Sequence, residues 1–89
     1  MRVQYDPDFS DKLKRVNVRI RKSFNEQIEL FKQNPHNSQL HNHALKEPYE
    51  GLRSIDITND YCTVYEEVPS GSEIAAYFSL LGTHDELYG

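Results

Sequence analysis

The sequence predicts an α+β fold in which an N-terminal helical hairpin packs on a small antiparallel sheet. Apolar residues recur at helical spacing through the first third of the chain, and three strand-like segments with short connections follow in its second half. Connections this short allow only antiparallel pairing of consecutive strands. The chain has 89 residues, so we expect a single domain spanning 1–89.

The first helix is expected to begin at Asp6-Pro7-Asp8, because acidic residues and a proline are favoured in the first turn. Residues 3–5 before it are a candidate for a short additional strand. A second helix is predicted from about residue 17 to Asn34-Pro35, which ends it. The apolar stripes that would face the sheet are Phe9, Leu13 and Val16 in the first helix, and Ile20, Phe24, Ile28 and Phe31 in the second.

Residues 34–51 have little periodicity and many Asn, Pro and His residues, which predicts a long loop. Strands are predicted at 52–58, 61–68 and 73–81, with turns at Asn59-Asp60 and at 69–72. Regular alternation in the last strand would place its residues on two faces. The two sets are Ile74, Ala76, Phe78 and Leu80 on one face, and Ala75, Tyr77, Ser79 and Leu81 on the other.

Charge is distributed unevenly along the chain, although the net charge is only -4. Residues 1–46 carry nine Lys/Arg and five Asp/Glu (+4), whereas residues 47–89 carry one and nine (-8). Six of the basic residues lie between Lys12 and Lys22, either as a solvated helical face or as a patch for nucleic acid or an acidic partner. The acidic second half argues against tight binding of naked nucleic acid by charge alone.

The single cysteine, Cys62, excludes an internal disulfide and a four-cysteine zinc site. A reducing cytoplasm is the simplest setting for such a chain. The first seven residues contain no apolar stretch typical of a signal peptide. The longest apolar-rich run, about eight residues, is too short to span a bilayer. We therefore expect a cytoplasmic protein that does not insert into membranes.

Polar residues suited to chemistry gather in two places. The terminal segment, residues 82–89, follows the last predicted strand directly, so a rigid element would deliver His84 and Tyr88 together. Histidines, carboxylates and an arginine suit acid–base work on a phosphodiester. The upstream residues of this kind are His43, Arg53, Asp56, Asp60 and Tyr61.

Several motifs carry a resemblance to a known family. They are Asn42-His43-Ala44-Leu45-Lys46, Tyr49-Glu50-Gly51-Leu52-Arg53-Ser54-Ile55-Asp56-Ile57, Asp60-Tyr61, Val64-Tyr65 and Gly82-Thr83-His84-Asp85-Glu86-Leu87-Tyr88. Together they resemble the RelE/ParE toxin superfamily, in particular its YafQ-like branch of type II toxin–antitoxin systems, over nearly the whole chain. The resemblance implies an endoribonuclease that cleaves mRNA in the ribosomal A site without a metal or other cofactor. It also implies a cognate antitoxin, with the ribosome and mRNA as the other partners.

The resemblance also implies the roles of individual residues. In this reaction the mRNA 2′-hydroxyl attacks the adjacent phosphate and the 5′-oxygen leaves. Asp56 stands where the branch has a further histidine, and an aspartate is a poor acid near neutral pH. The implied catalytic residues are His84, His43, Asp60 and Asp56, and the implied substrate-binding residues are Arg53, Tyr61, Tyr88 and Lys46.

Each assignment has a structural alternative. His84 and His43 are otherwise a solvated tail histidine and a surface loop histidine, and Asp60 also suits a turn. Regular alternation puts Arg53 on the face of Ile55, so it precedes the regular strand, is re-aimed by a bulge, or is structural. Tyr61 is equally suited to packing in a strand. A metal site at the loop histidines is disfavoured, because their spacing matches no common zinc pattern.

A non-enzymatic function is the alternative to the nuclease. The same superfamily contains toxins that poison DNA gyrase and degenerate members that only bind an antitoxin. The histidines and carboxylates favour the nuclease, because a gyrase poison has no evident need for them.

Overall fold

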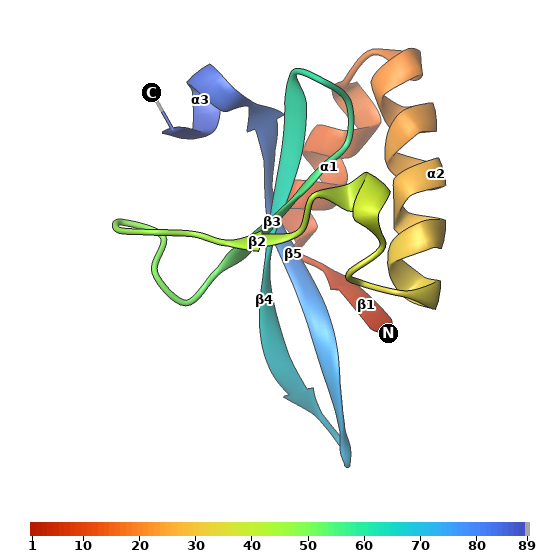
Figure 1. Ribbon diagram of the computed structural model, residues 1–89. Coiled ribbons are helices and arrows are strands. Elements are labelled where there is room, and N and C mark those ends of the chain that lie inside the picture. Colours follow the sequence, from red (N-terminus) through yellow and green to blue (C-terminus); the bar gives the residue numbers. More distant parts are fainter. Residues whose placement is uncertain (89) are drawn as a thin grey trace.

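A five-stranded mixed sheet lies at the centre of the structure, a computed structural model that describes residues 1–88 (Figure 1). The strand order is β1-β5-β4-β3-β2, and the predicted α+β class is confirmed. The strands are β1 (Arg2–Tyr5), β2 (His43–Ala44), β3 (Arg53–Asp56), β4 (Tyr61–Ser70) and β5 (Glu73–Thr83). The helices are α1 (Pro7–Arg15), α2 (Val18–Gln33), the 3-10 helix η1 (Ser38–Leu40) and α3 (His84–Tyr88). The sheet is not wholly antiparallel, because β1 pairs parallel to β5.

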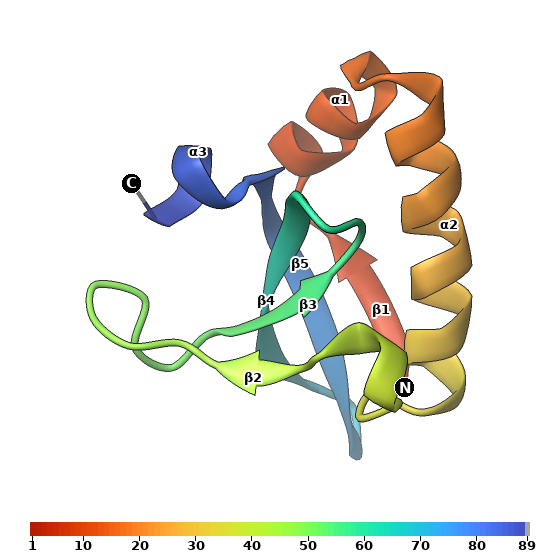
Figure 2. The same cartoon turned by 45° about the horizontal axis from the view of Figure 1, so that its top comes forward.

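The helical hairpin forms where the sequence predicts it. Asp6 caps α1 by accepting a hydrogen bond from the Asp8 amide at 2.9 Å, and Asn17 caps α2 by accepting one from the Arg19 amide at 2.7 Å. Both helices cover the same face of the sheet (Figure 2). The core beneath them is largely aromatic, and its buried rings are Phe9, Phe24, Phe31, Tyr65 and Phe78.

A β-bulge in β5 changes which residues face the helices. Val64 pairs with Leu80, but its neighbour Tyr65 pairs with Phe78, so Ser79 is an extra residue on β5. One extra residue reverses the alternation beyond it. The prediction that Leu80 shares the face of Phe78 is therefore wrong. Leu81, which is 1% exposed, packs in the core with Phe78 instead.

The region 34–51 is not an unbroken loop as predicted. It contains η1 and the short edge strand β2, in which His43 pairs with Ser54 of β3. Strand β2 could not be predicted from the sequence, because two residues show no periodicity and the strand forms only by pairing with β3. His43 consequently lies on the sheet rather than on a free loop.

The terminal segment is also not extended, because α3 begins directly after β5. The Thr83 Oγ1 accepts a hydrogen bond from the Glu86 amide at 3.1 Å, and Glu86 Oε1 accepts one from the Thr83 amide at 2.8 Å. This capping box starts the helix, and its Thr-x-x-Glu spacing is visible in the sequence. A Cβ at position 82 would lie 3.1 Å from Glu86 Oε1, so Gly82 leaves room for the capping carboxylate. Gly89, the last residue of the segment, lies outside the described residues.

Helix α3 lies on the side of the sheet opposite α1 and α2 (Figure 2). The Tyr88 hydroxyl donates to Ser54 Oγ at 3.1 Å, and the Tyr49 hydroxyl donates to the Leu87 carbonyl at 2.7 Å. These two bonds hold the short helix against the sheet and the connection before β3. No helix within residues 1–88 is long and apolar enough to cross a membrane.

Candidate functional site

Four of the predicted site residues meet in one pocket on this second face of the sheet. The pocket has a volume of about 320 Å³. Edge strand β2 and the residues after it form one wall, and α3 forms the other. The lining residues are His43, Ala44, Leu45, Lys46, His84 and Tyr88. The fold therefore brings two histidines from distant parts of the sequence to a single concave surface.

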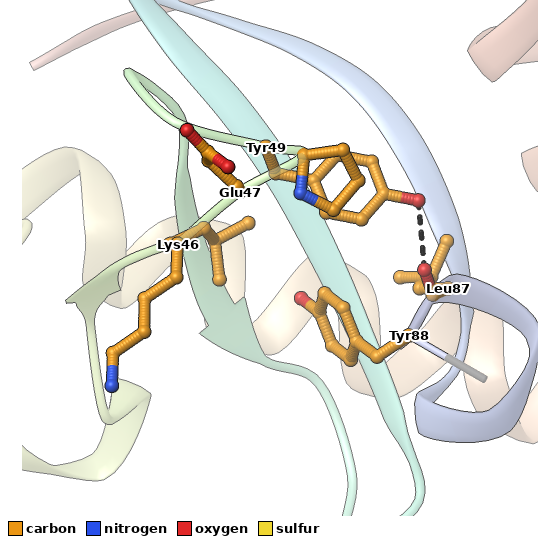
Figure 3. Close-up of a pocket in the computed structure, with 7 residues that line it drawn as sticks. Lys46, Glu47, Tyr49, Leu87 and Tyr88 are labelled. Atoms are coloured by element: carbon orange, nitrogen blue, oxygen red, sulfur yellow. Dashed lines mark hydrogen bonds between the residues drawn. The ribbon is translucent and has the colours of Figure 1, made fainter.

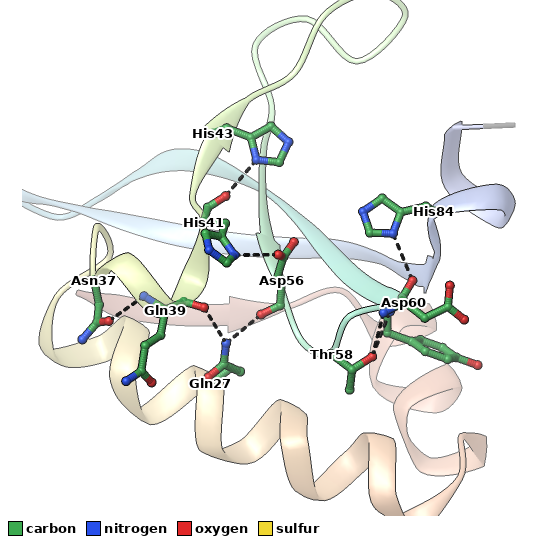
Figure 4. Close-up of polar contacts among 10 residues, drawn as sticks. Gln27, Asn37, Gln39, His41, His43, Asp56, Thr58, Asp60 and His84 are labelled. Carbon is green, nitrogen blue, oxygen red and sulfur yellow. Dashed lines mark hydrogen bonds and ion pairs between the residues drawn. The ribbon is translucent and has the colours of Figure 1, made fainter.

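His84 is the first residue of α3, and its ring is held by the turn before β4. Its Nδ1 lies 3.1 Å from the main-chain carbonyl oxygen of Asp60, which also accepts the His84 amide at 3.2 Å. A carbonyl oxygen can only accept, so Nδ1 carries the proton. Its Nε2 is then free to take a proton, or to donate one when the ring is charged. Asp60 thus acts on His84 through its carbonyl rather than its carboxylate (Figure 4).

His43 is oriented in the same way from the other wall. Its Nδ1 lies 2.8 Å from the main-chain carbonyl oxygen of His41. The same argument puts the proton on Nδ1 and leaves Nε2 free. Both imidazoles are exposed, so solvent and a substrate can reach them. The pocket therefore has two groups able to give or take protons.

A second pocket, of about 260 Å³, adjoins the first and shares Leu45, Lys46 and Tyr88 with it (Figure 3). The rings of Tyr49 and Tyr88 meet edge to face there, with centroids 5.9 Å apart. Burial raises the pKa of Tyr88 to about 12, because a phenolate would lose its hydration. Tyr88 therefore remains neutral at physiological pH, and its ring, 39% exposed, forms part of the pocket wall.

Arg53 is not brought to the pocket. It is the first residue of β3 and pairs with Tyr65 without a register shift, so it lies on the face of Ile55. Its Nε donates to Asn42 Oδ1 at 2.8 Å, and the Asn42 amide donates to the Tyr65 hydroxyl at 2.8 Å. The sequence left three explanations for the position of Arg53, and the regular pairing of β3 with β4 excludes a bulge at this residue. Arg53 braces the chain just before His43.

Asp56 and Tyr61 also lie outside the pocket. Asp56 faces away from the helices, as alternation predicts, and lines a different pocket of about 220 Å³ with His41. Its Oδ2 lies 2.8 Å from Nδ1 of His41. Tyr61 is half-buried and packs against the core under the helices. Its ring therefore takes up the packing role that the sequence allowed.

His41 is a residue that the sequence reasoning considered only as a weak metal ligand. It contacts Asp56 with its ring and His43 with its carbonyl oxygen. The signal in the sequence is the spacing of two between His41 and His43, which lets the main chain of one lie close to the ring of the other. Within residues 1–88, no group of three or more His, Cys, Asp or Glu side chains is arranged to hold a metal ion.

The comparisons with known proteins bear on the fold. No protein-family model and no curated protein matches the sequence. YafQ from E. coli strain BL21(DE3) matches over all of both chains, with 21% identity and a TM-score of 0.76. The YoeB/ParE toxin from Agrobacterium tumefaciens matches over 94% of this chain and 99% of its own, with 24% identity and a TM-score of 0.74.

A third similar structure is the E. coli DinJ-YafQ toxin-antitoxin complex. The match covers 98% of this chain and 96% of the other, with 20% identity and a TM-score of 0.73. The predicted resemblance is thus confirmed at the level of the fold, across nearly the full length. The chain has the fold of the YafQ and YoeB/ParE toxins.

Proposed function

We propose that this protein is the toxin of a type II toxin–antitoxin system and a ribosome-dependent endoribonuclease. It cleaves mRNA in the ribosomal A site by acid–base catalysis that needs no metal, and it acts in the cytoplasm, where translating ribosomes are. The supporting observation is the pocket that both His43 and His84 line, each with its Nδ1 bound to a main-chain carbonyl oxygen. The shared fold with YafQ and YoeB/ParE toxins agrees with this proposal.

Two imidazoles across one pocket suit transesterification of RNA. The neutral ring takes the proton of the 2′-hydroxyl as that oxygen attacks the adjacent phosphate. The charged ring donates its proton to the departing 5′-oxygen, so the proton balance closes with a cyclic phosphate and a 5′-hydroxyl as products. Imidazole is suited to both steps because it titrates near neutral pH. General acid–base catalysis of this kind contributes about 10²–10⁴-fold to a rate.

Lys46 and Tyr88 supply contacts for the substrate in this proposal. The Lys46 ammonium group offsets the negative charge that the phosphate gains in the transition state. Arg53 was expected in this role, but its guanidinium is engaged by Asn42 on the other face of the sheet. The exposed part of the Tyr88 ring can stack on a base, a contact worth roughly 1–3 kcal/mol.

A cognate antitoxin is the proposed protein partner. The similar DinJ-YafQ structure is a toxin-antitoxin complex, which supports this assignment. The basic residues between Lys12 and Lys22 lie on α1 and the first part of α2, and none of them lines the pocket. They form a positive surface suited to ribosomal RNA or to an acidic segment of the antitoxin.

Mapping mRNA cleavage by primer extension on translating ribosomes tests the proposal. The native protein, His84→Ala and His36→Ala are compared, since His36 is an exposed histidine that lines neither pocket. We expect cuts at A-site codons for the native protein and His36→Ala, and a loss of about 10²-fold or more in cleavage rate for His84→Ala. Cuts that persist unchanged in His84→Ala would move the chemistry to another residue. If no protein cuts, a binding function replaces the nuclease.

A further inference from the structure

We propose that His41 is a positioning residue, held by Asp56, that orients the imidazole of His43. The catalytic meaning of this inference rests on the proposed nuclease function, but the orientation itself does not. Two contacts of 2.8 Å run in series, from Asp56 Oδ2 to His41 Nδ1 and from the His41 carbonyl oxygen to His43 Nδ1 (Figure 4). The Asp56 carboxylate thus holds the His41 ring, and the His41 main chain in turn holds the His43 ring.

The backbone at His41 has an uncommon conformation that needs a stabilising contact. Its φ of 48° and ψ of 45° are in the left-handed region, which a non-glycine residue adopts uncommonly. This conformation aims the His41 carbonyl at His43. If the backbone relaxed to a common conformation, the carbonyl would turn away and His43 would lose its acceptor. The contact between the Asp56 carboxylate and the His41 ring opposes that relaxation.

Asp56 can hold the His41 ring in place because its own main chain is bonded to helix α2. The Gln27 side-chain amide donates to the Asp56 carbonyl at 2.9 Å and to the Gln39 carbonyl at 3.3 Å. A single side chain therefore ties the end of β3 to η1, the element that His41 follows directly. The Asp56 carboxylate is 29% exposed and the His41 ring 71% exposed, so the constrained partner is Asp56.

His43 depends on this contact because its own strand gives it little support. Strand β2 has two residues and lies at the edge of the sheet, where only β3 pairs with it. The Nδ1–H bond to His41 is what selects the tautomer in which Nε2 carries no proton. The arrangement assigns Asp56 an indirect role, acting through His41 rather than on the substrate.

Nitrogen-15 NMR of the histidine rings tests the orientation in the free protein. We expect His43 to be mainly the Nδ1–H tautomer in the native protein and in the His36→Ala control. In His41→Ala and Asp56→Ala, the Nε2–H tautomer, which imidazole prefers in water, should become the major form. His41→Ala is the safer variant because its ring is largely exposed, and circular dichroism confirms that each variant folds. An unchanged His43 tautomer in both variants would overturn the inference.

His41→Asn separates positioning from direct chemistry. Asparagine tolerates the left-handed backbone, so the carbonyl should stay in place and His43 should keep its tautomer. We expect cleavage by His41→Asn to stay within a few-fold of native, whereas kcat falls about 10–10²-fold in His41→Ala with KM little changed. Equal loss in both variants, with the tautomer retained in His41→Asn, would mean that the His41 ring acts itself. If the native protein does not cleave RNA, the proposed function fails and the tautomers alone decide this inference.

Discussion

The face of the sheet that α1 and α2 cover differs from the opposite face in the kind of side chain that it receives. On the covered face, Phe78 and Ile55 are completely buried among the aromatic rings of the hairpin. On the opposite face, the buried side chains Ser54 and Cys62 are small and contact the Tyr88 hydroxyl. The exposed histidines of the pocket lie beside them on this second face.

This difference separates stability from chemistry in one small domain. Burial of apolar rings on the first face supplies most of the driving force for folding. The second face keeps polar groups near solvent, held by hydrogen bonds that they donate to carbonyl and hydroxyl oxygens. Substitutions on the first face should therefore change the free energy of unfolding, and substitutions on the second should change activity.

The largest expected effect is that of Phe78→Ala on stability. The ring is 0% exposed and lies among five other aromatic rings, so its removal leaves a cavity. We expect a loss of about 3–5 kcal/mol in the free energy of unfolding, measured by urea denaturation. Ile74→Ala on the same strand is the control, because Ile74 is 58% exposed and should change stability by less than about 0.5 kcal/mol. Equal losses in the two variants would contradict the division between faces.

His43→Ala should lower activity strongly and leave the free energy of unfolding almost unchanged. The residue is exposed and its ring hydrogen-bonds the His41 carbonyl, so little packing is lost. We expect the cleavage rate to fall about 10²-fold or more. Denaturation and ribosome cleavage assays on the same samples, with His36→Ala as the control, measure both quantities. A large loss of stability would show that the second face also supports the fold.

Tyr88→Phe should have an intermediate effect, because it removes the bond between α3 and Ser54. We expect a loss of about 1 kcal/mol in stability. A double-mutant cycle with Ser54→Ala isolates the bond, and additive losses would show that the two hydroxyls do not interact. The raised pKa of Tyr88 favours the neutral phenol in the folded state, so its stabilising effect is present below the unfolded value of 10.0 and is lost as the pH rises to about 12. Alkaline denaturation of the native protein and Tyr88→Phe measures this loss.

Tyr77→Phe should have the smallest effect on stability, and the pH dependence of that effect identifies its cause. The Tyr77 hydroxyl donates to Asp6 Oδ2 at 2.8 Å, and this bond and that from the Asp8 amide lower the pKa of Asp6. The carboxylate is therefore favoured in the folded state. The native protein should be more stable than Tyr77→Phe above the ordinary value of 3.8, and this difference should shrink as the pH falls through the lowered pKa. A difference that is constant with pH would contradict the role of Asp6.

Local sequence signals were sufficient for the elements that depend on neighbouring residues. The start of α1 at Asp6, the start of α2 near residue 17, the apolar stripes and the strands β3, β4 and β5 could all be predicted, because each is decided within a few residues. The capping box of Thr83 and Glu86 was also readable, although the terminal helix it starts was not predicted. Strand β2 had no such signal, because it forms only by pairing with β3.

Sequence alone determined the α+β class, the helical hairpin and the residue types suited to acid–base chemistry. Only the tertiary structure decided which of those residues share a pocket. The bulge at Ser79, the bond between Arg53 and Asn42, and the carbonyl contact of His84 depend on how segments distant in the chain are aligned. Register is set by the packing of the whole core, and a shift of one residue would send each side chain to the other face.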